Sequence, residues 1–279
     1  MTDRRKMRIA VAGMDGTGKT TVLRRIHAKD GIAVIHAMRA HEDPASPFAE
    51  LSTALAGASA AADALGQVQL KIAVLAMHLS LYTPAEQLAT RQGWSVLADR
   101  HPLIDSLAYL PLFTRADAGA PSEADVDAWW ARQEPGAAEA VRDRLRTLSG
   151  TEDPRLLGAE LLRWGTKSLP ELLGLLSRQF DVTLPDGVVL FDLPVHEALR
   201  RIRERTRDSE LHETVSFLRA IRRRYDVVLD WLSEEHPATA VHRIDCSGRS
   251  VDEVTGLVRD VTATWSLRQG RRGARLDTW

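Results

Sequence analysis

The chain has 279 residues, of which 44% are hydrophobic, so it is long enough and apolar enough to bury the core of one large domain. Its 37 Lys and Arg residues nearly balance 38 Asp and Glu residues, and the net charge of -1 excludes a whole-protein field for attracting nucleic acid or anionic membranes. No stretch approaches the roughly 18 apolar residues of a membrane span. A single cysteine, Cys246, excludes an internal disulfide and a cysteine-based zinc site, so we expect a cytoplasmic protein.

Short apolar runs alternate along the chain with longer segments of helical periodicity. The predicted strands are 8–12, 32–38, 94–98, 187–191 and 240–244. Helical patterns between them include "TTVLRRIHA", "LKIAVLAMHLSL" and "HEALRRIRERT". Continuous apolar runs are typical of strands covered on both faces, so the alternation predicts an α/β fold with a parallel sheet and right-handed crossovers. Such a sheet binds ligands at the C-terminal ends of its strands.

The segment 116–180, between the third and fourth predicted strands, is predicted to be a helical insertion. Ser122 and Asp125 form a capping box at the start of its first helix. The Ala-rich segment 54–66 is interpreted as a helix end and a turn. The segment 268–279 is rich in Arg and Gly without a periodic apolar face, so we expect a basic mobile tail after a single domain over 1–267.

The stretch "GMDGTGKTT", residues 13–21, follows the first predicted strand and begins a helix. It matches the phosphate-binding pattern G-x-x-x-x-G-K-[ST], in which glycines let backbone N–H groups surround a phosphate. Lys19 would reach the β- and γ-phosphates, and the Thr20 hydroxyl would ligate Mg²⁺. The sequence therefore predicts ATP and Mg²⁺ as cofactors. The residues expected to bind the donor are Gly13, Asp15, Gly16, Thr17, Gly18, Lys19, Thr20 and Thr21.

Asp99 and Arg100 follow the third predicted strand, at the sheet edge where the loop is expected. A carboxylate at Asp99 could hold the water shell of Mg²⁺ or take a proton from an acceptor. The Arg100 guanidinium could grip an acceptor phosphate or a transferring phosphoryl oxygen in bidentate fashion. We therefore predict Asp99 as a metal and catalytic residue and Arg100 as a catalytic and acceptor-binding residue.

Four segments resemble the thymidylate kinase family. "GMDGTGKTT" is similar to the family's G-x-D-G-x-G-K-T-T loop, and "VLADRHPLIDSLAYL" to its strand, Asp-Arg pair and Ser-x-Ala-Tyr segment. "LFDLPVHEALRRIRERT" resembles the fourth strand and Arg-rich lid, and "HRIDCSGRSVDEV" the last strand and adenine-side loop. The resemblance covers about two thirds of the chain. It implies a P-loop NTPase fold with a five-stranded parallel sheet, and a homodimer.

Arginines are crowded near residue 200, where like charges on one helix face destabilise the helix unless an anion arrives. In phosphoryl transfer the transferring group is such an anion, and a closing lid of arginines neutralises its charge. By resemblance the lid spans about 200–213, with catalytic Arg201, Arg203 and Arg205. Arg207 is a further candidate.

On the acceptor side, the resemblance implies that Asp15 contacts the acceptor's sugar and that Arg39, Arg100 and Tyr109 lie near the acceptor. His78 stands about where the family has an arginine against the base, although a histidine on an apolar helix is more often part of the core. The family's Arg-x-Pro-Gly-Gly-Thr segment is reduced to Arg39 and a displaced proline, and Leu110 replaces a glutamine. The machinery for phosphate transfer is retained, whereas the base-reading groups are mostly lost.

These features predict an ATP- and Mg²⁺-dependent phosphotransferase whose acceptor is a nucleoside monophosphate or a related small molecule. A second kinase interpretation has a free hydroxyl as the acceptor, with Asp99 as the general base. A third, from another class, is a regulatory ATPase that transfers phosphate to water. Trp129, Trp130 and Trp164 of the insertion could stack on a ring, but packing onto the sheet is favoured.

Overall fold

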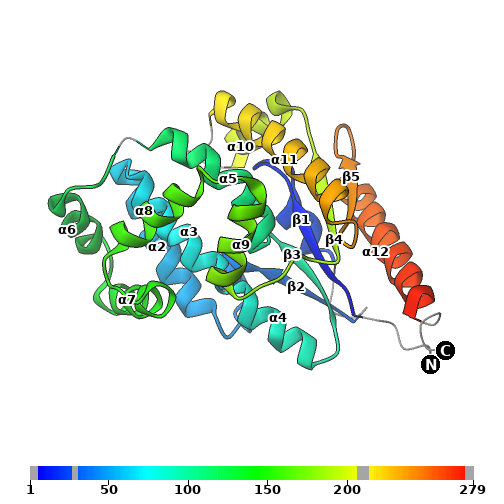
Figure 1. Ribbon diagram of the computed structural model, residues 1–279, viewed down its shortest axis with the longest axis horizontal. Coiled ribbons are helices and arrows are strands. Elements are labelled where there is room, and N and C mark those ends of the chain that lie inside the picture. Colours follow the sequence, from blue (N-terminus) through cyan, green and yellow to red (C-terminus); the bar gives the residue numbers. More distant parts are fainter. Residues whose placement is uncertain (1–5, 27–30, 118, 206–213, 274–279) are drawn as a thin grey trace.

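A parallel sheet of five strands, in the order β2-β3-β1-β4-β5, forms the centre of the protein in this computed structural model (Figure 1). The structure describes residues 6–26, 31–117, 119–205 and 214–273, with side chains except for 205 and 267–273. The strands are β1 (Arg8–Ala12), β2 (Ile32–His36), β3 (Ser95–Asp99), β4 (Gly187–Asp192) and β5 (Ala240–Asp245). The predicted α/β fold with a five-stranded parallel sheet is confirmed.

The three inner strands are the most buried because helices cover both of their faces. β1, β3 and β4 consist almost entirely of buried residues, whereas β2 and β5 at the sheet edges are partly exposed. β2 was predicted to continue to residue 38. It ends at His36 because the chain turns there into the 3-10 helix η2 (Ala37–Glu42).

Helices connect the strands and fill the layers on either side of the sheet. Those before β4 are α1 (Lys19–Leu23), α2 (Ala49–Leu65), α3 (Val68–Leu79), α4 (Tyr82–Arg91), α5 (Pro102–Ala116), α6 (Glu123–Ala131), α7 (Pro135–Ser149), α8 (Pro154–Trp164) and α9 (Leu169–Phe180). Those after it are α10 (Val195–Arg205), α11 (Val215–Glu235) and α12 (Val251–Gly273). In Figure 1, α2, α3 and α6 to α8 lie together at the end of the molecule away from β4 and β5, whereas α11 packs on α5 and α12 packs on α1.

The predicted helical insertion between β3 and β4 is confirmed as α6 to α9. α6 begins with the predicted capping box, because Ser122 Oγ accepts from the Asp125 amide and the Asp125 carboxylate accepts from the Ser122 amide. Trp129 is completely buried, and its indole N–H donates to the Ala58 carbonyl of α2 at 2.8 Å. Trp129 is therefore a core residue, as expected, but it packs on α2 and not on the sheet.

Two further contacts fix the insertion against α3, which carries part of the site described below. A Cβ at Gly158 of α8 would lie 2.2 Å from the Gln69 carbonyl oxygen, so only glycine allows α8 to approach α3 this closely. Arg144 of α7 donates to the Ser80 carbonyl at 2.7 Å, just after the C-terminus of α3. Such a bond satisfies a carbonyl at a helix end and complements the helix dipole. The insertion thus holds α3 in place from its outer side.

The chain after β5 forms one long helix, α12. The expected tail over 268–279 overlaps this helix, which continues to Gly273; residues 274–279 lie outside the described residues. Within the described ranges, none of the helices combines the length and the apolar character that a membrane span requires.

Candidate active site

The phosphate-binding loop lies between β1 and α1, as its sequence predicts. Gly16 adopts φ +82°, and a Cβ there would lie 2.5 Å from the Ala198 carbonyl oxygen of α10. Glycine is required at this position for both reasons, because L side chains rarely adopt that φ and no space exists for one. Gly16 thereby brings the backbone of α10, where the lid was predicted, directly against the loop.

Lys19 points back into the loop that precedes it. Its amine donates to the carbonyl oxygens of Gly13 at 2.7 Å and Met14 at 3.0 Å, and the residue is 6% exposed. Burial lowers the pKa of the Lys19 amine, as does the nearby charge of Arg100, whereas Asp15 and Asp99 oppose this shift. These two weak carbonyl partners leave a concentrated positive charge where an ATP phosphate would bind.

Thr20 and Asp99 meet across the gap between α1 and the end of β3. Thr20 Oγ1 donates to Asp99 Oδ2 at 2.6 Å, and the Nδ1 atom of His36 lies 3.3 Å from the same oxygen. Burial alone would raise the pKa of Asp99, but the bond to His36, the charge of Lys19 and the bond from Thr20 together lower it to about 2. Asp99 is therefore a carboxylate at any physiological pH.

His36 was not predicted, although sheet register places it in the site. His36 and Asp99 are partners in the parallel pairing of β2 with β3, so both side chains stand at the same edge of the sheet. Because the strand was expected to continue to residue 38, His36 was not recognised as the residue at its C-terminal end. A strand ending at His36 would have brought the histidine next to Asp99.

Arg100 connects the loop to the acceptor side. Its guanidinium lies 2.5 Å from Asp15 Oδ1 and donates to Asp105 Oδ1 at 3.2 Å, and its centre lies 5.1 Å from the Tyr109 ring centroid. Although burial opposes the charge, Asp15, Tyr109 and Asp105 raise the pKa of Arg100. Its backbone has φ +72°, a left-handed conformation that costs a non-glycine residue about 1–3 kcal/mol and is concentrated at functional sites.

Two aromatic hydroxyls complete this arrangement. Tyr109 donates to Asp15 Oδ2 at 3.3 Å, and Tyr225 of α11 donates to Asp105 Oδ1 at 2.8 Å. The backbone N–H of His101 donates to the other oxygen of Asp105 at 2.7 Å. Burial raises the pKa of Asp105, and Arg100 opposes that shift. Asp105 thus accepts from both Arg100 and Tyr225, so these two residues, neither of which was predicted, fix the position of the guanidinium.

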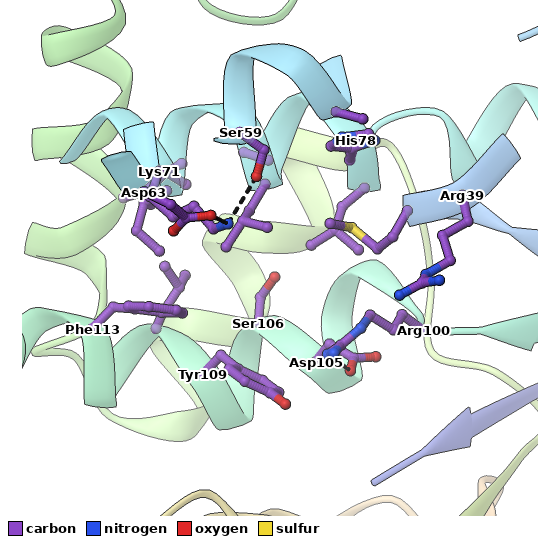
Figure 2. A pocket seen from close by; sticks show the side chains of 18 of the residues that line it. Arg39, Ser59, Asp63, Lys71, His78, Arg100, Asp105, Ser106, Tyr109 and Phe113 are labelled. Carbon is purple, nitrogen blue, oxygen red and sulfur yellow. Dashed lines mark hydrogen bonds and ion pairs between the residues drawn. The ribbon is translucent and has the colours of Figure 1, made fainter. Parts of the chain in front are cut away.

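A cavity of about 720 Å³ opens beside Arg100, between α2 and α3 on one side and α5 on the other (Figure 2). Its volume is in the range of small-molecule sites. A smaller cavity of about 60 Å³ lies at the P-loop and is lined by Lys19, Thr20 and Asp99 among others. The residues common to both cavities are Asp15, Met38, Arg39 and Arg100. The phosphate loop and the larger cavity therefore meet at these four side chains.

The predicted acceptor residues all line the larger cavity: Asp15, Arg39, His78, Arg100 and Tyr109. Arg39 donates to Glu42 at 3.1 Å. His78 is 2% exposed, and burial, with His41 as the next cause, lowers its pKa to about 3, so it is a neutral imidazole. It is therefore both a core histidine and a wall residue of the cavity.

A charged cluster on α2 and α3 also lines the cavity and was not predicted. Lys71 donates to Ser59 Oγ at 2.8 Å and forms an ion pair with Asp63 (Figure 2). One signal for this cluster is present in the sequence. Lys71 is the one charged acid or base among the mainly apolar residues of α3 apart from His78, and Ser59 and Asp63 share one face of the Ala-rich helix at i, i+4 spacing. Ser59 and Asp63 were not singled out because the Ala-rich segment was interpreted as low complexity.

The predicted lid arginines lie on or beside α10, of which the structure describes only part. Arg201 lies 3.8 Å from Glu197, Arg200 donates to Glu204 at 2.9 Å, and Arg203 is exposed. The side chain of Arg205 and the segment 206–213, with Arg207, lie outside the described residues. Arg201 and Arg203 lie on the same helix as Ala198, whose backbone is directly against Gly16 of the loop.

The residues present fit a magnesium–nucleotide complex. The Thr20 hydroxyl and the Asp99 carboxylate are oxygen ligands of the kind that Mg²⁺ prefers, and they lie together beside the loop. Within the described residues there is no cluster of three or more His, Cys, Asp or Glu side chains that could hold a metal without a nucleotide. Phosphate oxygens and water would complete the coordination.

The loop at the end of β1, the parallel strand order and the helical layers define the P-loop NTPase fold in its kinase form. Among solved structures, a thymidylate kinase from Candida albicans is similar over 93% of this chain and 92% of its own, with a TM-score of 0.53 and 14% sequence identity. A deoxyadenosine kinase from M. mycoides with bound dCTP is similar over 92% of this chain and 100% of its own, with a TM-score of 0.47 and 13% identity.

Sequence comparisons give no further assignment. No family model matches the chain, and the curated proteins contain no match. The likeness to the thymidylate kinase extends over nearly the whole chain, so the thymidylate kinase-like fold expected from the motifs is confirmed.

Proposed function

We propose that this protein is an ATP- and Mg²⁺-dependent phosphotransferase that transfers the γ-phosphoryl group to a small molecule bound in the larger cavity, either a nucleoside monophosphate or a close relative. One observation carries this proposal. The P-loop cavity and the larger cavity share Asp15, Arg39 and Arg100, so a donor phosphate and an acceptor group would meet at these side chains.

Each residue of the loop side has a role that follows from its chemistry. Lys19 and the loop amides would bind the β- and γ-phosphates, and Thr20 and Asp99 would hold Mg²⁺. When bound, Mg²⁺ neutralises developing charge on the phosphate oxygens. Arg100 would orient the transferring or accepting oxygens, and Arg201 and Arg203 would approach when α10 closes.

The pKa of Asp99 supports the metal-binding role over the role of a general base. A base that takes a proton from a hydroxyl works best with a pKa near the operating pH, and the pKa of Asp99 is about 2. A phosphate acceptor has far less need of deprotonation. This favours a nucleoside monophosphate, or another acceptor that already carries phosphate.

A different observation favours the alternative acceptor, a free hydroxyl. The charge of Arg100 is already compensated by Asp15 and Asp105, so its attraction for an acceptor phosphate is weaker than that of an unpaired arginine. In that case Asp15, which stands where the cavities meet, replaces Asp99 as the group nearest the acceptor hydroxyl. The regulatory ATPase receives no such support, because a cavity for a second substrate adjoins the loop.

The test is to measure ADP release from ATP with a panel of nucleosides, nucleoside monophosphates and sugars. Release that depends on a phosphorylated acceptor supports the main proposal, and release that depends on an unphosphorylated one supports the alternative. ADP release at the same rate with and without every acceptor would contradict both.

A further inference from the structure

His36 lines the P-loop cavity, yet phosphate transfer as proposed above gives it no role. It shares that cavity with Thr20 and Asp99, and its side chain is 15% exposed. The sheet fixes its place, because His36 and Asp99 are paired residues of β2 and β3. An imidazole beside the carboxylate assigned to Mg²⁺ therefore requires an explanation.

The contact between His36 and Asp99 defines where the imidazole carries a proton. His36 Nδ1 lies 3.3 Å from Asp99 Oδ2. An ionised carboxylate can only accept a hydrogen bond, so Nδ1 must carry the proton and donate it. His36 is therefore a donor to Asp99 from a neighbouring strand.

Asp99 receives its hydrogen bonds on one oxygen. Thr20 Oγ1 donates to Oδ2 at 2.6 Å, and His36 Nδ1 approaches the same atom. Among the residues that the structure describes, none donates to Oδ1, and this atom is not enclosed, since Asp99 lines the P-loop cavity. Oδ1 is therefore the oxygen that remains for a cation or its water shell.

The two cations nearest to Asp99 do not hold its carboxylate. The Lys19 amine donates to two carbonyl oxygens of the loop instead, and Arg100 pairs with other carboxylates. The terminal torsion of an aspartate is broad, so its two oxygens exchange places unless donors fix them. Thr20 is one such donor, but it is also a candidate metal ligand. His36 is the donor whose only assigned partner is the carboxylate.

We infer that His36 is a positioning residue for the magnesium–nucleotide complex: with Thr20, its Nδ1–H holds Asp99 Oδ2 and so leaves Oδ1 available to the cation or its water shell. Hydrogen bonds that orient a metal ligand from outside commonly change metal affinity by about 10- to 100-fold. This inference rests on the proposed function, because it takes Asp99 and the loop as the site of Mg²⁺ and the donor nucleotide. In this role His36 acts through Asp99 and not on the nucleotide itself.

Calorimetry on the full-length chain tests the inference without phosphoryl transfer. The probe is adenylyl imidodiphosphate, an ATP analogue with an uncleaved terminal bridge, titrated once with saturating Mg²⁺ and once with EDTA. The ratio of the two dissociation constants measures how much the cation strengthens nucleotide binding. His36→Phe keeps a ring but lacks the N–H, so it should lower that ratio by about tenfold or more while the affinity in EDTA stays the same.

His36→Asn places an amide NH₂ where Nδ1–H was, and should keep the ratio within about threefold of the unsubstituted protein. His242→Phe makes the same ring change at an exposed histidine of β5 that does not line the P-loop cavity, and should leave the ratio unchanged. In an Asp99→Asn background, His36→Phe should change the ratio by less than about twofold, because the carboxylate through which it acts is gone. Thermal unfolding checks each variant, and His36→Ala replaces His36→Phe if the latter does not fold.

An unchanged ratio in the folded His36→Phe or His36→Ala variant, an equal loss in His36→Asn, or an undiminished effect in the Asp99→Asn background would each overturn the inference. So would an unsubstituted protein whose affinity for the analogue is not raised by Mg²⁺. Phosphoryl transfer is measured separately as ADP release. A ratio that depends on His36 without ADP release to any acceptor would contradict the proposed function alone, and acceptor-dependent release with a ratio independent of His36 would contradict this inference alone.

Discussion

Arg100 forms an ion pair with Asp15, and this contact joins the end of β3 to the phosphate loop. The two residues are far apart in sequence, and each lines both cavities. The Asp15 carboxylate is therefore held by Arg100 at the place where the two cavities meet. The pair therefore lies at the boundary between the two cavities.

Replacing Arg100 with lysine should lower kcat/KM by about 100-fold with little change in ATP affinity. Lysine keeps the charge but cannot contact Asp15, Asp105 and a phosphoryl oxygen with one planar fork. Steady-state kinetics with the best acceptor of the panel measure the effect. Arg223→Lys, at an exposed position on α11, is the control and should behave as the unsubstituted protein. Equal kinetics for both variants would remove Arg100 from the mechanism.

Tyr225→Phe should reduce kcat/KM by about five- to tenfold and destabilise the fold by about 1 kcal/mol. The substitution removes the hydrogen bond to Asp105 and so loosens the carboxylate that holds Arg100. Tyr82→Phe removes a buried hydroxyl whose partner is Glu86, outside both cavities, and should affect stability alone. Identical losses of activity in the two variants would show that Tyr225 acts only through general stability.

Ala60→Phe should raise the acceptor KM by at least about tenfold and leave the ATP KM unchanged, because the new ring would fill part of the cavity that Ala60 lines. Thr53→Phe places the same side chain at an exposed position of α2 that does not line the cavity. The two KM values, measured for both variants, decide the location of the acceptor. An increase in the ATP KM only would place the acceptor elsewhere.

The protein should lose stability as the pH falls below about 6.5. His78 and His101 have folded pKa values of about 3 because they are buried, whereas the unfolded value is 6.5. The unfolded state therefore binds more protons between these values, so the stabilising effect is complete above pH 6.5 and decreases toward pH 3. Each histidine contributes about 1.4 kcal/mol per pH unit in that window.

Urea unfolding at several pH values measures this slope. His101→Asn keeps a side-chain acceptor for the Leu103 amide at the start of α5 and removes one titrating group, so the slope should be about half as steep. A slope unchanged by that substitution would mean that His101 is not the group that titrates.

The sequence predicted the sheet and the loop because both depend on local patterns. Continuous apolar runs specified the strands, and the spacing of Gly13, Gly18 and Lys19 specified the loop. Asp99 and Arg100 were also predicted, because a residue at the end of a parallel strand must lie at the same edge of the sheet as its neighbours.

The cavity wall could not be predicted in the same way, because it is formed by tertiary packing. Ser59, Asp63 and Lys71 come together only where α2 packs on α3, and Asp105 meets Tyr225 only where α5 packs on α11. No local pattern specifies those helix contacts. The leucine at position 110, in place of the family's glutamine, suggested that the acceptor pocket had lost polar side chains. The larger cavity is nevertheless lined by Ser59 and Asp63 of α2 and Lys71 of α3.

The most direct test of the account is the rate of ADP release with and without acceptor, for the unsubstituted protein and for Lys19→Ala. The account predicts saturable release that depends on one class of small acceptor and falls at least about 1,000-fold in Lys19→Ala, while the thermal unfolding midpoint stays nearly the same. Release that is independent of every acceptor, or unchanged in a folded Lys19→Ala variant, would contradict it.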